Sequence, residues 1–210
     1  MAPSTPKKKT TATRRRNRPS PRQRLLDSAT NLFSTEGIRV IGIDRILREA
    51  DVAKASLYSL FGSKDALVIA YLEALDEQSR QAWVDRTKTM ADAEDKILAF
   101  FDMAIAEEPG KDFRGSYFQN AANEYPKPET DSERGIIAAC LAHRTWMHQT
   151  MTDLLTAKNG YPSSTQANQL LIFLDGGLAG ARFVRHVSPL ETARDLARQM
   201  LLAPPADYSI

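Results

Sequence analysis

Three side chains in the second half of the sequence, Ser116, His143 and Asp175, are of the types that a nucleophilic hydrolase uses. Such chemistry needs the base and the nucleophile within hydrogen-bonding distance, and no nucleophile-elbow, phosphate-loop or dinucleotide motif accompanies them. The 3 histidines and the 1 cysteine are scattered and lack the spacing of a metal site. We therefore predict no enzyme activity, no cofactor and no metal.

A second group of polar residues is suited to binding phosphate. Tyr58, Ser63 and Lys64 lie close together in the stretch ADVAKASLYSLFGSKDAL, residues 50–67. Hydroxyl and ammonium groups are common partners of DNA phosphates. The preceding helical piece has a polar face of compact side chains, which are Lys54, Ala55, Ser56 and Ser59. Because a thin face can approach another surface closely, this pattern favours DNA as a partner.

The charge distribution agrees with a nucleic-acid partner for the first third of the chain. Residues 1–67 hold 14 Lys and Arg against 6 Asp and Glu, whereas residues 68–210 hold 14 against 20. Residues 1–21 combine basic residues with Pro, Ser and Thr and have no apolar periodicity, which predicts a disordered basic arm. We consider two roles for this arm, a solvated leader or a minor-groove contact.

Hydrophobic spacing predicts an all-α protein with about nine helices and requires no strand. Leu25, Leu26, Ala29, Leu32 and Phe33 form an amphipathic stripe that Gly37 ends. Two short stripes follow, at 43–50 and 54–61, and a long helix is expected from the N-cap Ser63. Further helices are expected at 92–108, 113–124, 131–158, 164–183 and 189–200.

The expected location is cytoplasmic, at the nucleoid, without membrane contact. Cys140 is the single cysteine, so no intramolecular disulfide is expected and a reducing compartment fits best. The basic N-terminus is not followed by the apolar stretch of an export signal. The most apolar run, residues 170–181, is interrupted by Asp175 and is shorter than the roughly 20 residues that a span needs.

The segment GIDRILREADVAKASLYSLFGSKDAL, preceded by RLLDSATNLFSTEG, resembles the DNA-binding domain of the TetR family of bacterial repressors. The family signature is read here as Leu57, Tyr58, Phe61, Lys64 and Leu67. The resemblance implies a three-helix, helix-turn-helix DNA-binding domain over residues 22–67, whose third helix enters the major groove. The DNA-binding residues it implies are Arg45, Lys54, Ala55, Ser56, Tyr58, Ser59, Ser63 and Lys64, with Lys54 the candidate for a guanine contact.

Four positions of the DNA-binding segment depart from the family pattern, and one of them is Leu60, which replaces a frequently polar, backbone-contacting residue. Asp51 stands where the turn glycine is usual, Ala53 where a serine caps the recognition helix, and Gly42 where a capping Thr or Ser is common. Loss of a capping side chain costs about 1 kcal/mol of local stability. We expect the fold to survive these changes, with fewer phosphate contacts than usual.

The rest of the chain resembles the effector-binding and dimerising domain of a TetR subgroup, through FRGSYFQNAANEYPKPE and QLLIFLDGGLAGA. This implies a larger helical domain at 68–203, a ligand cavity among its middle helices, a homodimer formed by the last two helices, about 164–203, and a tail at 204–210. Pockets need a few polar groups among apolar ones. The candidate effector-binding residues are Phe101, Phe113, Tyr117, Phe118, Asn120, His143, Trp146, Met147 and Phe173.

The predicted function is that of a homodimeric transcriptional repressor that an unknown small-molecule effector releases from double-stranded operator DNA. The alternative is a constitutive or architectural DNA-binding protein without an effector. A filled core would favour this alternative, whereas a cavity lined by a few polar groups would favour a ligand-responsive regulator.

Overall fold

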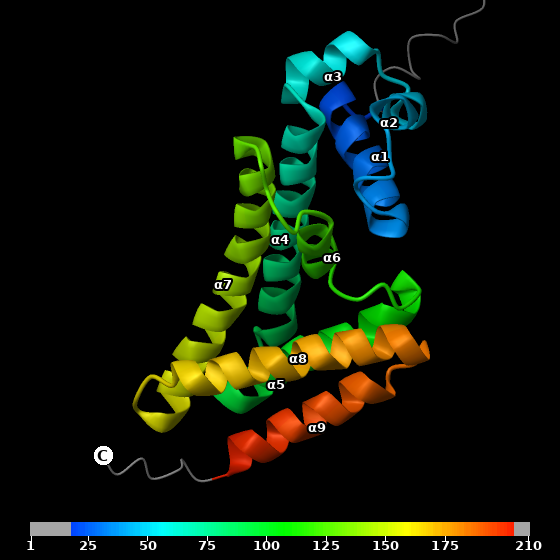
Figure 1. Cartoon of the computed structure of the whole chain (residues 1–210). Coiled ribbons are helices and arrows are strands. Elements are labelled where there is room, and N and C mark those ends of the chain that lie inside the picture. The colour runs from blue at the N-terminus through cyan, green and yellow to red at the C-terminus, as the bar shows by residue number, and fades with distance from the viewer. Residues whose placement is uncertain (1–17, 204–210) are drawn as a thin grey trace, which may run out of the picture.

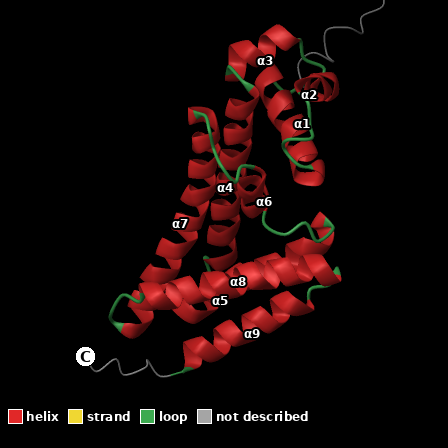
Figure 2. Ribbon diagram, in the orientation of Figure 1, coloured by secondary structure: helices red, strands yellow, loops and turns green. Residues whose placement is uncertain are grey.

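A computed structural model describes residues 18–203 of the chain. Between these residues it contains nine α-helices, one short 3-10 turn and no strand, which confirms the predicted all-α class (Figures 1 and 2). Most of the predicted basic arm and the predicted tail at 204–210 lie outside the described residues. Within the described range, no helix is both long and apolar enough to cross a membrane.

The first three helices form the helix-turn-helix unit. They are α1 (Pro21–Glu36), α2 (Ile43–Ala50) and α3 (Lys54–Phe61). Helix α1 begins because Pro21 follows the N-cap Ser20, whose hydroxyl accepts the N–H of Gln23 at 3.2 Å. It ends at Gly37, whose φ of 107° is a backbone conformation that glycine adopts readily and other residues rarely do. Figure 1 shows α1–α3 gathered around one end of the next helix.

Helix α4 (Lys64–Thr87) joins this unit to the rest of the molecule. The predicted cap is present, since the Ser63 hydroxyl accepts the N–H of Ala66 at 3.0 Å. Helix α7 (Asp131–Asn159) packs beside α4, and a capping box between Thr130 and Glu133 begins it (Figure 1). The two long helices therefore connect the helix-turn-helix unit to the other end of the molecule.

Three helices form the end of the molecule opposite α1–α3, namely α5 (Ala93–Glu107), α8 (Ser164–Val184) and α9 (Ser188–Leu202). The 3-10 turn η1 (Glu108–Lys111) follows α5, and α6 (Tyr117–Glu124) lies beside α4 and packs against α7. Helices α8 and α9 run antiparallel along their lengths, and α5 packs against α9 (Figure 1). Ser163 caps α8, because its hydroxyl accepts the N–H of Gln166 at 3.4 Å.

The expected start of one helix is wrong. We predicted a helix from Phe113 to Glu124, but α6 begins at Tyr117. Asp112 and Phe113 have positive φ values of 53°, a conformation that a helix does not contain. The N-cap is instead Ser116, whose hydroxyl accepts the N–H of Gln119 at 3.3 Å.

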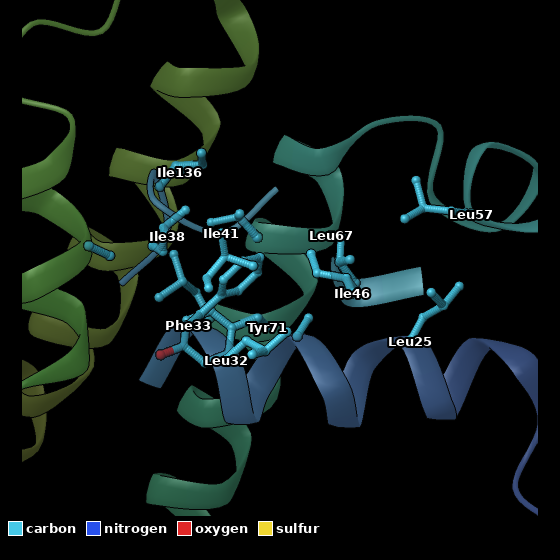
Figure 3. Packing of buried hydrophobic residues seen from close by; sticks show 14 of the residues in the cluster. Leu25, Leu32, Phe33, Ile38, Ile41, Ile46, Leu57, Leu67, Tyr71 and Ile136 are labelled. Carbon is cyan, nitrogen blue, oxygen red and sulfur yellow. The ribbon is translucent and has the colours of Figure 1, made fainter. Parts of the chain in front are cut away.

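Two clusters of buried side chains hold these helices together. Figure 3 shows the first, in which Leu25, Phe33, Ile46, Leu57 and residues of α4 pack around the helix-turn-helix unit. This cluster continues to Ala121 on α6 and to Ile136 and Cys140 on α7. The second cluster joins α5, α7, α8 and α9. The predicted boundary between residues 67 and 68 thus crosses a continuous core and stays a prediction.

Candidate DNA-binding surface and ligand cavity

The turn between α2 and α3 positions the predicted recognition helix. Asp51 adopts the left-handed conformation, with φ of 50° and ψ of 56°, so it fills the place of a turn glycine. Arg24 of α1 stabilises this turn, because its Nη1 donates to the carbonyl oxygens of Ala50 and Asp51 at 2.8 Å each. Gly42 and Ala53 occupy the N-caps of α2 and α3 and provide no side-chain hydrogen bond, which matches the departures noted in the sequence.

Helix α3 divides into a buried and an exposed face. Leu57 is fully buried and anchors the helix, while Tyr58 keeps 46% of its surface exposed. The exposed positions of α3 are Lys54, Ala55, Tyr58, Ser59 and Leu60, whereas Ser56 is half-buried. Lys54 Nζ lies 3.7 Å from Asp44, an exposed ion pair of the kind that contributes little to stability. Because this ion pair is weak and exposed, the Lys54 ammonium can exchange Asp44 for another partner.

Lys64 makes an internal contact that the sequence did not indicate, whereas Ser63 makes the predicted cap. Lys64 Nζ donates to the carbonyl oxygen of Ile38 at 2.6 Å, and burial lowers the pKa of its ammonium group. The Ser63 hydroxyl caps α4. Lys64 therefore links α4 to the turn that joins α1 and α2, and its phosphate contact stays a prediction.

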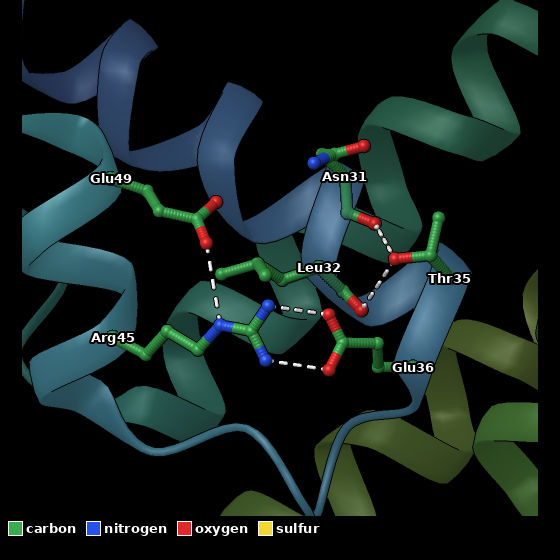
Figure 4. A network of polar contacts seen from close by, with 6 residues as sticks. All are labelled: Asn31, Leu32, Thr35, Glu36, Arg45 and Glu49. Atoms are coloured by element: carbon green, nitrogen blue, oxygen red, sulfur yellow. Dashed lines mark hydrogen bonds and ion pairs between the residues drawn. The ribbon is translucent and has the colours of Figure 1, made fainter.

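Arg45 is engaged by two carboxylates (Figure 4). Its Nη1 and Nη2 donate to Glu36 at 2.5 and 2.6 Å, and its Nε donates to Glu49 at 3.3 Å. The hydrogen bonds from Arg45 lower the pKa of Glu36, and those to Glu36 raise the pKa of Arg45. These bonds use three of the five N–H groups of the guanidinium, and they join α2 to α1. A phosphate contact by Arg45 stays a prediction.

A cavity of about 760 Å³ lies between the helix-turn-helix unit and the remaining helices. One wall comes from α1, and the others come from α4, α5, η1, α6, α7 and α8. Five of the nine predicted effector-binding residues line it, namely Tyr117, Phe118, His143, Trp146 and Met147. A cavity of this size is typical of a small-molecule site.

The other four predicted residues do not line this cavity. Phe101 is fully buried in the second core cluster, and Phe113 and Phe173 pack against the same cluster. Asn120 is satisfied by protein groups, since its Nδ2 donates to the carbonyl of Arg114 at 2.9 Å and its Oδ1 accepts from Arg182 at 2.8 Å. Aromatic residues at helical spacing are thus divided here between core and cavity.

Sequence reasoning missed several lining residues. Helix α1 contributes Thr30, Asn31, Ser34 and Thr35, and other helices contribute Leu75, Gln78, Ser79, Trp83, Phe100, Met103 and Glu107. The α1 residues lie on the polar side of an amphipathic helix, which in isolation predicts a solvent-exposed face. Trp83 and Phe100 could have been included on their residue types alone.

A stripe of apolar and small residues is exposed along α8. Ile172 and Phe183 keep 61% and 88% of their surface exposed, and Gly176 and Ala179 lie between them on the same face. Gly177 and Gly180 instead face α9, where an added Cβ would lie 3.0 Å from Ala193 and 2.7 Å from Pro189. The small residues of this segment therefore serve two different surfaces.

A helix-turn-helix unit joined to a helical domain with a cavity defines a DNA-binding transcriptional regulator. Residues 25–71 match the model of the bacterial regulatory proteins of the tetR family. SCO4454, a TetR-family transcriptional regulator from Streptomyces coelicolor, is 32% identical, with a TM-score of 0.74 over 86% of this chain and 94% of that one. The chain belongs to the TetR family, whose members are transcriptional regulators rather than enzymes.

Two further comparisons agree with this assignment. The HTH-type transcriptional regulator LmrA of Bacillus subtilis is 34% identical over 80 residues, which span 38% of this chain and 43% of that relative. The chain thus matches less than half of the length of LmrA. The reduced form of NemR from E. coli shares the fold, with a TM-score of 0.73 and 23% identity over 89% of this chain and all of that one.

Proposed function

We propose that the protein is a homodimeric repressor that a small molecule in the cavity between α1 and α4–α8 releases from operator DNA. The observation that carries this proposal is the position of α6. Near its first turn, Tyr117 and Phe118 line the cavity. At its last residue, Glu124 accepts hydrogen bonds from the backbone N–H groups of Ile38, at 2.9 Å, and Arg39, at 2.6 Å.

This arrangement supports coupling between ligand and DNA binding. Ile38 and Arg39 belong to the turn between α1 and α2, so a ligand that moves α6 acts on the helix-turn-helix unit through the three hydrogen bonds that Glu124 accepts. The α1 residues in the cavity wall offer a second, direct contact. Coupling free energies of about 1 to 3 kcal/mol are typical of such systems. An architectural protein without an effector has no use for a cavity of about 760 Å³, which favours the regulated protein.

A second copy of the chain is the proposed partner of the exposed α8 stripe. In a two-fold dimer each residue of the stripe meets its symmetry-related copy or a neighbour of it. Gly176 and Ala179 would allow the two α8 helices to approach closely, with Ile172 and Phe183 on either side. The dimer would present two α3 helices to two halves of a symmetric site. In this proposal, the protein acts in the cytoplasm, at the nucleoid.

Selection from a library of random duplex DNA tests the proposed function. Because the dimer has two equivalent α3 helices, we expect the enriched sequences to contain an inverted repeat. The same motif is expected upstream of the gene or its neighbours, which footprinting would locate. Enrichment of an asymmetric motif, or no enrichment at all, would contradict the proposal.

Lys54 and Lys64 are expected to contribute in different ways to operator binding. Lys54→Ala should weaken binding by roughly 1 to 3 kcal/mol and relax the preference at one base position, because Lys54 is exposed on α3. Lys64→Ala should weaken all sequences about equally and also lower the thermal midpoint, since it removes the bond to Ile38. Binding to a panel of single-base variants of the selected operator measures both effects. Identical profiles for the two variants would refute the assigned roles.

A further inference from the structure

One wall of the cavity is formed by aromatic rings in mutual contact. Trp83 and Phe100 stack with ring centroids 5.4 Å apart, and Trp146 lies edge-on to Phe100 at 5.7 Å. His143 continues the wall, 5.5 Å from Trp146, and Phe118 stacks on its ring at 3.8 Å. Flat rings of a ligand pack well against such a surface, since aromatic pairs are stable when offset or edge-to-face.

The cavity contains charged groups, but each has an oppositely charged or polar partner. Glu107 pairs with Lys111 at 2.9 Å. Asp175 accepts hydrogen bonds from Gln119 at 2.6 Å and from Arg144 at 2.7 Å. Within the described residues, no charged side chain of this lining is left without such a partner. A charged ligand would be removed from water without a compensating ion, which is costly.

His143 provides a fixed hydrogen-bond acceptor in this lining. Its Nδ1 lies 2.8 Å from Oδ1 of Asp76, and Asp76 is itself held by Arg80 at 2.7 Å. Because a carboxylate can only accept, Nδ1 carries the hydrogen and Nε2 of the neutral ring is an acceptor. Burial lowers the pKa of His143, against the opposing effect of Asp76, which favours the neutral ring. None of the hydrogen bonds among the described residues involves Nε2, and His143 lines the cavity.

The part of the lining that α1 contributes is polar and uncharged. It consists of the hydroxyl and amide side chains of Thr30, Asn31, Ser34 and Thr35. Two of the hydroxyls already have partners, because Ser34 pairs with Tyr71 at 3.1 Å and Thr35 donates to the carbonyl of Asn31 at 2.7 Å. Neutral polar groups of this kind suit a ligand with hydroxyl or carbonyl substituents rather than an ion.

We infer that the effector is an uncharged aromatic compound with a hydroxyl group. The hydroxyl donates a hydrogen bond to Nε2 of His143, and the rings of the compound pack on the aromatic side chains Trp83, Phe100, Trp146 and Phe118. This inference rests on the proposed effector function of the cavity, and it adds the chemical class of the ligand. Because α1 also lines the cavity, a compound that fills it would contact the helix-turn-helix unit directly.

Calorimetric titration of the DNA-free protein with three naphthalene derivatives tests the ligand class. 2-Naphthol is neutral and donates a hydrogen bond, 2-methoxynaphthalene has no donor, and 2-naphthoate is an anion at neutral pH. We expect 2-naphthol to bind about tenfold more tightly than 2-methoxynaphthalene, because only the hydroxyl satisfies Nε2. We expect 2-naphthoate to bind most weakly.

Two variants assign this preference to one side chain. His143→Phe keeps a ring against Phe118 but removes the acceptor, so the two neutral probes should bind equally well. The matched control is His148→Phe, since His148 also lies on α7, bonds to Ser164 and does not line the cavity. Circular dichroism checks that both variants fold. If the His143→Phe protein does not fold, the order of affinities of the three probes for the wild type still tests the ligand class.

Three results would overturn the inference. They are tightest binding by 2-naphthoate, equal binding of the two neutral probes to the wild type, and no binding by any probe. The titration contains no DNA, so it is separate from the proposed release of the operator. A wild-type ranking as expected, together with an operator complex that 2-naphthol leaves intact, would refute the release and not the ligand class.

Discussion

Replacing Phe183 with glutamate is expected to produce a monomer whose operator binding is weaker by roughly 100-fold or more. Phe183 is 88% exposed in the single chain, at one end of the α8 stripe. In the proposed dimer it is buried, and two-fold symmetry would introduce the new carboxylate twice. Burial of unpaired charge is strongly unfavourable, so the dimer dissociates and each chain retains contact with one half-site. Sedimentation analysis measures the first effect and fluorescence anisotropy the second.

The matched control is Val84→Glu. Val84 is also an exposed apolar residue, 50% accessible, but it lies on α4 outside the α8 stripe. The Val84→Glu protein should stay dimeric and bind the operator normally. A dimeric Phe183→Glu protein with full affinity would show that another surface of the chain forms the dimer.

Replacing Glu124 with alanine is expected to lower the free energy of unfolding by about 1.5 to 3 kcal/mol, the usual contribution of hydrogen bonds to a charged group. The Glu124 carboxylate accepts N–H bonds from Ile38 at 2.9 and 3.0 Å and from Arg39 at 2.6 Å. Without it, these two N–H groups lose their partner in a part-buried turn. Their amide hydrogens should therefore exchange roughly 10-fold to 100-fold faster. Chemical denaturation and hydrogen exchange measure the two effects.

Asn123→Ala provides the control for Glu124, because Asn123 is an exposed neighbour on the same helix. It should leave stability and exchange close to those of the wild type. If Glu124 also transmits the effector signal, Glu124→Ala should reduce the ligand-induced loss of operator affinity. Equal exchange rates in the Glu124→Ala protein and the wild type would mean that α6 does not hold the α1–α2 turn.

The helix-turn-helix unit could be predicted from the sequence because local signals agree there. Gly37 ends α1, Ser63 caps α4, and Leu57 takes its buried place at the spacing that the signature implies. Asp51 was expected to tolerate the left-handed turn, and it does so. The start of α6 was wrong because positive φ values at two successive residues, Asp112 and Phe113, were not expected. Asp tolerates this conformation better than most residues, but Phe rarely adopts it.

The cavity was only partly predictable, because helical periodicity identifies an inward face without saying what that face meets. Phe101 and Phe118 are both aromatic, yet one is in the core and the other lines the cavity. Ser34 and Thr35 line the cavity because of the way α1 packs against α4. This is a long-range arrangement that no local sequence signal indicates. Likewise, the bonds from Arg45 to Glu36 and from Lys64 to Ile38 join separate elements.

The most direct test of the account is the stoichiometry of the protein on the inverted repeat obtained by selection. Anisotropy and sedimentation would compare this duplex with one that holds a single half-site. We predict two chains on each full site and binding to the half-site duplex that is weaker by roughly two orders of magnitude, because the second α3 helix loses its partner. One chain per duplex, with equal affinity for the full site and the half-site, would contradict the account.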